Sequence, residues 1–192
     1  MHAAVNSPFD PASAKSRLLE LIRERAYRDG LDIVLASGKR SDFYINGKKV
    51  SLHPEGLWLI ARLLLHKLAA HPEITAVGGL TLGADPLAAA VAALSFETGQ
   101  NLKAFLVRKE AKGHGTGSRI EGELEPGEKV CILEDTVTTG GSAKKAIDAV
   151  LEAGAEPVVV MTIADREDPD ADAFRREWRV EALVTLSEIR AR

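Results

Sequence analysis

The sequence predicts an α/β fold with a mainly parallel central sheet flanked by helices. Short runs that are apolar throughout alternate with helical patterns along most of the chain, and such strands are typical of a parallel sheet covered on both faces. No repeat, low-complexity stretch or linker divides the 192 residues, which are enough for one core. We therefore expect a single domain that spans residues 1–192.

The first predicted element is a helix that Asp10 can cap and Pro11 can begin, because proline suits the first helical turn. Gly30 is its expected end. Apolar periodicity and turn residues predict the other elements in this order: strands 31–36 and 42–46 around a Ser37-Gly38 turn, helix 54–70, strand 74–78, helix 85–98, strand 102–107, strand 129–134, helix 142–153, strand 157–163, helix 170–178 and strand 181–186.

Composition excludes several classes of protein. Hydrophobic residues make up 45% and charged residues 28% of the chain, as in ordinary globular proteins, and the net charge of -3 argues against a general nucleic-acid binder. The longest apolar runs, near 57–65 and 87–94, are too short to span a bilayer, and the N-terminal segment lacks the pattern of a signal peptide. Cys131 is the single cysteine, which fits a reducing compartment. We expect a cytoplasmic protein without a membrane or nucleic-acid partner.

Ligands of such sheets bind where the strands end at their carboxyl edge. Five loops are expected to open on that edge, namely 36–48, 79–85, 108–122, 134–142 and 165–169.

One of these loops predicts a phosphate site. Residues 130–142 read VCILEDTVTTGGS, so a buried strand ends in Glu134 and Asp135, a loop of threonines and glycines follows, and a helix begins at Ser142. Small residues and a helix N-terminus let backbone N–H groups converge on a phosphate, while two carboxylates can accept hydrogen bonds from ribose hydroxyls. The segment lacks the ending of a Walker A loop. The alternative is a plain strand, turn and capped helix.

A second loop concentrates positive charge. Residues 107–117 read VRKEAKGHGTG and place Arg108, Lys109, Lys112 and His114 among glycines. A glycine-rich loop with these side chains can close over a polyanion and expel water. The alternative is a solvated basic surface loop.

These segments together resemble a known family. Residues 130–142 resemble the phosphoribosyl-pyrophosphate motif of the type I phosphoribosyltransferases, and RKEAK-G-H-G at 108–115 resembles the catalytic loop of the orotate phosphoribosyltransferases. Three further segments resemble the same family in the expected order: LASGKRSDFYIN at 35–46, VGGLTLGADPLA at 77–88 and IADRE at 163–167. The resemblance implies the type I phosphoribosyltransferase fold, with a small hood from the N-terminal and C-terminal segments. It also implies transfer of ribose 5-phosphate from phosphoribosyl pyrophosphate (PRPP) to orotate, giving orotidine 5′-monophosphate and diphosphate on the way to UMP.

The resemblance also implies roles for individual residues. Lys112 would be catalytic. The basic loop 108–117 would form a lid that reaches the neighbouring subunit of a homodimer, and it would bind the pyrophosphate there through Arg108, Lys109, Lys112 and His114. The acids Glu134 and Asp135 would hold the ribose hydroxyls. The 5-phosphate would be wrapped by Thr136, Val137, Thr138, Thr139, Gly140, Gly141 and Ser142. Orotate would meet Arg166 through its carboxylate, and also Thr138, Tyr44 and Ile45.

Some of these residues have plainer interpretations. Arg166 could instead form a surface ion pair with Glu167 or Asp168, and Tyr44 could be a core aromatic. Many family members carry lysine where Ala36 stands, and whether Lys39 or Arg40 replaces it is open.

The resemblance implies Mg²⁺ as a cofactor, carried on pyrophosphate and ribose oxygens rather than on a protein metal site. His53, His66 and His71 form no His-x-x-x-His pair, so no metal-ligating residues are predicted. Two other functions stay open: phosphoribosyl transfer to another base, and a PRPP-sensing regulator. The acidic composition and the lid cations argue against the regulator.

Overall fold

The computed structural model describes residues 9–34, 40–110 and 119–191, and it contains the predicted sheet. Six strands lie in the order β10-β9-β8-β5-β6-β7, all parallel except that β7 runs antiparallel to β6. Their bounds are β5 Ala76–Leu80, β6 Lys103–Val107, β7 Ile120–Gly122, β8 Lys129–Val137, β9 Glu156–Asp165 and β10 Val180–Thr185. The mainly parallel sheet is therefore confirmed.

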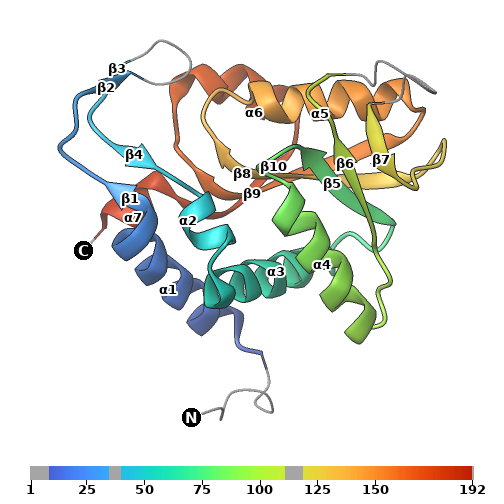
Figure 1. The fold of residues 1–192 in the computed structure, drawn as a ribbon, viewed down its shortest axis with the longest axis horizontal. Helices are drawn as coiled ribbons and strands as arrows, with labels where there is room; N and C mark the ends of the chain where they lie inside the picture. Colours follow the sequence, from blue (N-terminus) through green and yellow to red (C-terminus); the bar gives the residue numbers. More distant parts are fainter. Residues whose placement is uncertain (1–8, 35–39, 111–118, 192) are drawn as a thin grey trace.

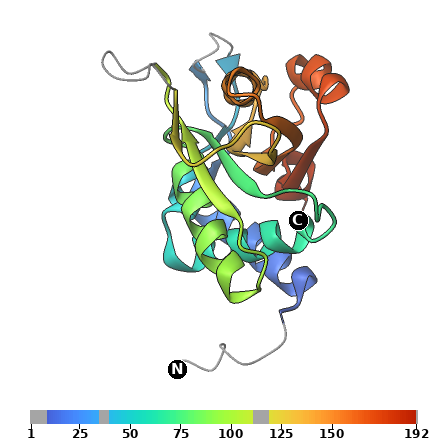
Figure 2. The same cartoon turned by 90° about the vertical axis from the view of Figure 1, so that its right-hand side faces the viewer.

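Helices cover both faces of the sheet (Figures 1 and 2). On one face lie α1 (Pro11–Leu21), α3 (Pro54–Leu68) and α4 (Asp85–Glu97), and on the other α5 (Gly141–Glu152) and α6 (Asp172–Glu177). The first half of β8, residues 130–133, is apolar throughout because it is buried on both faces: Cys131 and Leu133 belong to the first core, while Val130 and Ile132 belong to the second. The central strand thus carries its last residues to the edge where ligands bind.

A small hood from the two ends of the chain stands beside the sheet. Strand β1 (Tyr27–Arg28) pairs with β4 (Tyr44–Ile45), and β2 (Ile33–Val34) pairs with β3 (Arg40–Ser41), both antiparallel. The C-terminal helix α7 (Leu186–Arg190) joins them, because Arg190 Nε donates to the Tyr27 hydroxyl at 2.9 Å. The strands predicted at 31–36 and 42–46 are present in shorter form, as β2 and β4, and the two do not pair with each other, since Tyr44 and Ile45 pair with β1; residues 35–39 lie outside the described ranges.

Two further boundaries differ from the sequence prediction. Asp10 caps α1 as expected, by accepting from the N–H groups of Ala12 and Ser13. The helical segment, however, ends in a π-turn at Ile22–Ala26, and Gly30, with φ of 68°, lies in the turn after β1. Strand β8 continues to Val137, because β9 pairs with it as far as Asp165, so the phosphate loop is shorter than expected.

Five short elements were not predicted: β1, β3 and α7, described above, and two more. Helix α2 (Lys48–Ser51) has four residues, and β7 has three residues inside the polar segment 108–122. A short helical turn at Pro169–Ala171 leads into α6. Within the described parts of the chain, no helix is long and apolar enough to cross a membrane.

Candidate active site

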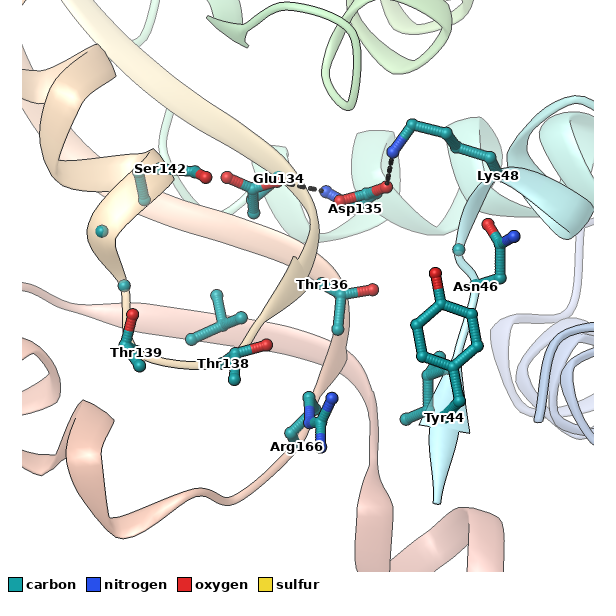
Figure 3. A pocket seen from close by; sticks show the side chains of 16 residues that line it. Tyr44, Asn46, Lys48, Glu134, Asp135, Thr136, Thr138, Thr139, Ser142 and Arg166 are labelled. Carbon is teal, nitrogen blue, oxygen red and sulfur yellow. Dashed lines mark hydrogen bonds and ion pairs between the residues drawn. The ribbon is translucent and has the colours of Figure 1, made fainter. Parts of the chain in front are cut away.

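A cavity of about 320 Å³ opens at the carboxyl end of β8, between the sheet and the hood. It is lined by Tyr44, Ile45, Asn46, Gly47, Lys48, Glu134, Asp135, Thr136, Val137, Thr138, Thr139, Gly140, Gly141, Ser142, Ala143 and Arg166. The structure therefore brings together every predicted phosphate-loop, ribose and base residue. Figure 3 shows Ser142 and Thr139 on one side of the cavity and Tyr44 on the other.

The phosphate loop depends on Gly140. Its φ is 82°, and an added Cβ would lie 2.4 Å from Cγ of Phe174. Only glycine meets both constraints, and the chain turns there to begin α5 at Gly141. The N-cap residue Gly140 has no side chain with which to cap this helix, so the N–H groups of the first turn can bind an anion in the cavity.

The two acids end the central strand in different surroundings. Glu134 is buried, and burial raises its pKa to about 8, with a further contribution from the neighbouring Asp135. Asp135 is also largely buried, and its Oδ2 accepts from Nζ of Lys48 at 2.7 Å (Figure 3). Asp135 is thus paired with a cation, whereas burial favours the protonated form of Glu134.

Lys48 also lines the cavity, although its sequence context does not predict this position. It begins α2, and Gly47 before it packs directly on β8: an added Cβ would lie 3.1 Å from Cβ of Asp135 and 3.2 Å from Oγ1 of Thr136. The segment 36–48 was expected at this edge, but nothing in its pattern links Lys48 to an acid 87 positions away. Because glycine has no side chain, the backbone before Lys48 can approach β8 closely enough for the lysine to reach Asp135.

Arg40 does not fill the role of the lysine that is absent at Ala36. Its guanidinium Nε donates to Oδ1 of Asp32 at 2.9 Å on the exposed outer side of β3. Ala36 and Lys39 lie outside the described residues. Among the described residues near the acids, Lys48 is the cation that contacts them.

The loop after β5 also reaches the acids. An added Cβ on Gly83 would lie 3.1 Å from Oδ1 of Asp135 and 3.2 Å from Oε1 of Glu134. Loop 79–85 was expected to open on the carboxyl edge of the sheet, and this position agrees with that prediction.

Arg166 lies at the opposite end of the cavity from Lys48 (Figure 3). The residue is 6% exposed, its Nη2 donates to Ser41 Oγ at 3.1 Å, and its Cζ lies 4.3 Å from the centre of the Phe43 ring. Burial lowers its pKa, and its buried Nε has no hydrogen-bond partner among the described residues. The alternative of a surface ion pair is therefore wrong, because β9 and the hood enclose the side chain.

Tyr44 and Ile45 line the same end. The Tyr44 side chain is exposed, so the alternative of a core aromatic is also wrong, whereas Ile45 is buried. Oγ1 of Thr136 is another buried polar atom of the cavity without a described partner. Unpaired buried polar groups are uncommon in folded proteins, so these atoms favour a polar ligand.

Of the four basic lid residues, Arg108 and Lys109 lie within the described ranges. Arg108 pairs with Glu121 at 3.0 Å, and its N–H donates to the Arg119 carbonyl, which joins the two ends of the lid. Of the described lid residues, neither Arg108 nor the exposed Lys109 lines the cavity of its own chain. Lys112 and His114 lie outside the described residues.

No group of three or more His, Cys, Asp or Glu residues in the described ranges could hold a metal ion. Glu134 and Asp135 are the two carboxylates that line the cavity. Oxygen donors of this kind suit Mg²⁺ only if a substrate supplies further ligands.

Comparison with known proteins agrees with the geometry. No protein-family model matches the chain. An orotate phosphoribosyltransferase of Thermosynechococcus vestitus is 48% identical over 182 residues, which cover 94% of this chain and 95% of the relative. A crystal structure of Mycobacterium tuberculosis orotate phosphoribosyltransferase with Fe(III) dicitrate is 38% identical, covers 93% of this chain and 99% of its own, and superposes with a TM-score of 0.78. A structure of the same enzyme in complex with PRPP is 35% identical, covers 92% and 98%, and has a TM-score of 0.73. With this identity over nearly the whole chain, and with the phosphate loop, acid pair and buried arginine in one cavity, the chain belongs to the orotate phosphoribosyltransferase family.

Proposed function

We propose that the chain transfers ribose 5-phosphate from PRPP to orotate in this cavity, giving orotidine 5′-monophosphate and diphosphate for pyrimidine biosynthesis. The observation that carries the proposal is the set of groups that the cavity brings together. It is lined by a phosphate loop, by two carboxylates with Lys48 beside them, and by a buried arginine whose Nε has no hydrogen-bond partner among the described residues. A phosphorylated sugar and an anionic base match these groups.

The sugar phosphate would bind along the end of β8. The N–H groups and hydroxyls of residues 136–142 would hold the 5-phosphate, since a helix N-terminus and small residues suit an anion. Glu134 and Asp135 would accept hydrogen bonds from the ribose hydroxyls. Lys48 would then lie close to the pyrophosphate end, because its ammonium already contacts Asp135.

Orotate would bind between the hood and β9. Its carboxylate would pair with the guanidinium of Arg166, whose Nε has no hydrogen-bond partner among the described residues. Thr138, Tyr44 and Ile45 would surround the ring. Uracil lacks the carboxylate and would leave Arg166 buried without its partner.

The lid would complete the site of a neighbouring subunit in a homodimer. The support is that Arg108 and Lys109 stand outside the cavity of their own chain although four lid residues carry cationic or titratable side chains. Together with Lys112 and His114 they would grip the pyrophosphate, with Lys112 as the catalytic lysine. A two-fold partner would make both sites equivalent.

The reaction would then need positioning and electrostatic stabilisation rather than covalent catalysis. The ring nitrogen of orotate attacks C1 of the ribose and gives up its proton to solvent or to the departing pyrophosphate, while the bond from C1 to the pyrophosphate oxygen breaks and pyrophosphate leaves with the electron pair. Positive charge develops on the sugar beside Glu134 and Asp135, and negative charge develops on the pyrophosphate beside Lys48 and the lid lysines. Closure of the lid would exclude water from the reacting sugar.

Mg²⁺ is the cofactor that we propose for this site. Glu134 and Asp135 are the protein oxygens that would face it, and two carboxylates fit an ion that keeps water and substrate oxygens as its other ligands. When bound, Mg²⁺ would supply charge neutralisation to the pyrophosphate. A cytoplasmic location stays a prediction from the sequence.

A panel of bases tests the proposal. The purified protein is assayed with PRPP and either orotate, uracil, adenine or nicotinate, and pyrophosphate release is followed. Orotate alone should support rapid release. Release with another base and not with orotate would support a different phosphoribosyltransferase, while PRPP binding without release for any base would support a regulator.

A further inference from the structure

The C-terminal helix α7 contacts the base end of the cavity from two sides. Ser187 in its first turn donates to Glu167, the residue that follows Arg166 in the chain. Its last residue, Arg190, lies over the Phe43 ring, which the Arg166 guanidinium also contacts. None of its residues lines the cavity itself. Any effect of α7 on orotate must therefore act through Arg166 and Phe43.

The first contact fixes the backbone beside Arg166. Oε2 of Glu167 accepts from the N–H of Ser187 at 2.7 Å and also from the Ser187 hydroxyl. Glu167 has φ of 54°, a left-handed conformation that is uncommon for a residue with a side chain. The surrounding contacts must hold such a conformation in place, and Ser187 makes two of them.

The second contact fixes the ring beneath Arg166. Cζ of Arg190 lies 4.7 Å from the centre of the Phe43 ring, and Cζ of Arg166 lies 4.3 Å from the same centre. Phe43 is buried, and the two guanidiniums share it. An arginine over an aromatic face is attracted by the quadrupole of the ring, so each guanidinium restricts where the ring can lie.

Arg190 is itself held by the hood. Its Nε donates to the Tyr27 hydroxyl at 2.9 Å, and its Nη2 lies 3.4 Å from Oδ1 of Asp29 and 3.4 Å from Oδ2 of Asp42. Asp42 precedes Phe43 in the chain. Arg190 thus connects β1, the turn before β4 and the aromatic ring in one group of contacts.

We propose that Arg190 and Ser187 are positioning residues for orotate, acting through Phe43 and Glu167 to hold the Arg166 guanidinium toward the cavity. This rests on the proposed function, in which Arg166 binds the orotate carboxylate. PRPP binds at the other end of the cavity, so its binding does not depend on α7. Loss of a positioning residue should therefore raise KM for orotate and leave KM for PRPP unchanged.

The test compares Arg190→Gln, Ser187→Ala and the control Arg17→Gln, with KM for orotate, KM for PRPP and kcat measured for each. Arg17 matches Arg190 as a partly exposed arginine that pairs with two carboxylates, those of Glu20 and Glu55. Arg190→Gln should raise KM for orotate about fivefold, the order expected when a cation–π contact is lost, with KM for PRPP unchanged. Ser187→Ala should give a smaller rise of the same kind, since its N–H still holds Glu167. The control should leave all three constants unchanged.

A second measurement separates positioning from general loosening of the hood. In a protein that already carries Phe43→Leu, Arg190→Gln should have little further effect on orotate, because the ring through which it acts is gone. The same fivefold rise in that background, or an equal rise in KM for both substrates, would overturn the proposal. Arg166→Ala is measured alongside: if it does not weaken orotate binding, the proposed role of Arg166 fails, whereas a loss there without a loss in Arg190→Gln refutes the role of α7 alone.

Discussion

The ammonium of Lys48 contacts the carboxylate of Asp135 at 2.7 Å, and this ion pair joins the short helix α2 to the last residues of the central strand β8. The Lys48 side chain is 46% exposed and that of Asp135 is 13% exposed. Burial disfavours the charge on Lys48, but the bond to Asp135 outweighs it and raises the pKa of the lysine. The pair therefore places a cation beside the acid where the cavity opens.

The first prediction concerns Lys48 itself. Lys48→Met should raise KM for PRPP about tenfold, or about 1.4 kcal/mol, because a cation beside the pyrophosphate is lost. The matched control is Lys49→Met on the same helix, since Lys49 is exposed and borders a different opening with Glu24, Arg25 and Arg28. Equal effects of the two substitutions on KM would show that only overall charge matters.

The second prediction concerns the pH dependence of stability. The pKa of Glu134 is about 8 in the folded protein, above its ordinary value of 4.5. Between these values the folded state binds a proton that the unfolded state has released, so its stability falls as pH rises toward 8. The free energy of unfolding, measured in urea from pH 5 to pH 9, should decline over this range.

Glu134→Gln is the variant that isolates this effect. Glutamine cannot ionise, so the decline with pH should be smaller, and the variant should be the more stable protein at pH 9. Glu152→Gln, at the exposed end of α5, serves as the control and should follow the unmodified protein. An unchanged slope in Glu134→Gln would mean that another group causes the decline.

The third prediction tests whether Arg166 binds the carboxylate of orotate. Arg166→Ala should weaken orotate binding by about 2–5 kcal/mol, the loss seen when one partner of a buried charged pair is truncated, and it should leave PRPP binding nearly intact. Arg176→Ala, on the exposed side of α6, is the control. KM values for both substrates give the answer, and an equal loss for both would remove Arg166 from the base site.

The fourth prediction concerns Lys112 of the lid, which rests on the sequence because the residue lies outside the described ranges. Lys112→Ala should lower kcat more than it raises KM, since a lid cation helps most when charge develops on the departing pyrophosphate. Steady-state kinetics with both substrates test this. A change confined to KM would mean that the lysine binds ground state and transition state equally.

The fifth prediction concerns the shared lid. Lys112→Ala dimers and Arg166→Ala dimers are mixed under conditions that let subunits exchange, and activity is measured at an orotate concentration far below the KM of the Arg166→Ala protein, where neither parent dimer turns over appreciably. If each lid serves its neighbour, a mixed dimer has one site with both substitutions and one intact site, so about a quarter of the unmodified activity should return. No recovery, with exchange confirmed by differently tagged subunits, would mean that each lid closes over its own chain.

The sequence predicted those parts of the site that depend on local pattern. Glu134 to Ser142 form a continuous stretch whose acids, small residues and helix start have one plain structural solution, and they all line the cavity. Two features could not be predicted in this way. The contact of Lys48 with Asp135 joins positions 87 apart, and α2 is too short to have a periodic pattern. Arg166 stands among charged neighbours, so its burial depends on the hood packing over the end of β9.

Strand β8 has a consequence for how the site can open. It is hydrogen-bonded along both edges, to β5 and to β9, and it contributes residues to both cores. Interior strands of this kind exchange their amide hydrogens only when the whole domain unfolds, as part of one cooperative unit. Strand β8, which carries Glu134 and Asp135, is therefore expected to stay folded until the whole fold opens. Local opening falls instead on the hood, where β1 and β4 pair through two residues each, and the base end of the cavity is the part that can loosen without unfolding the protein.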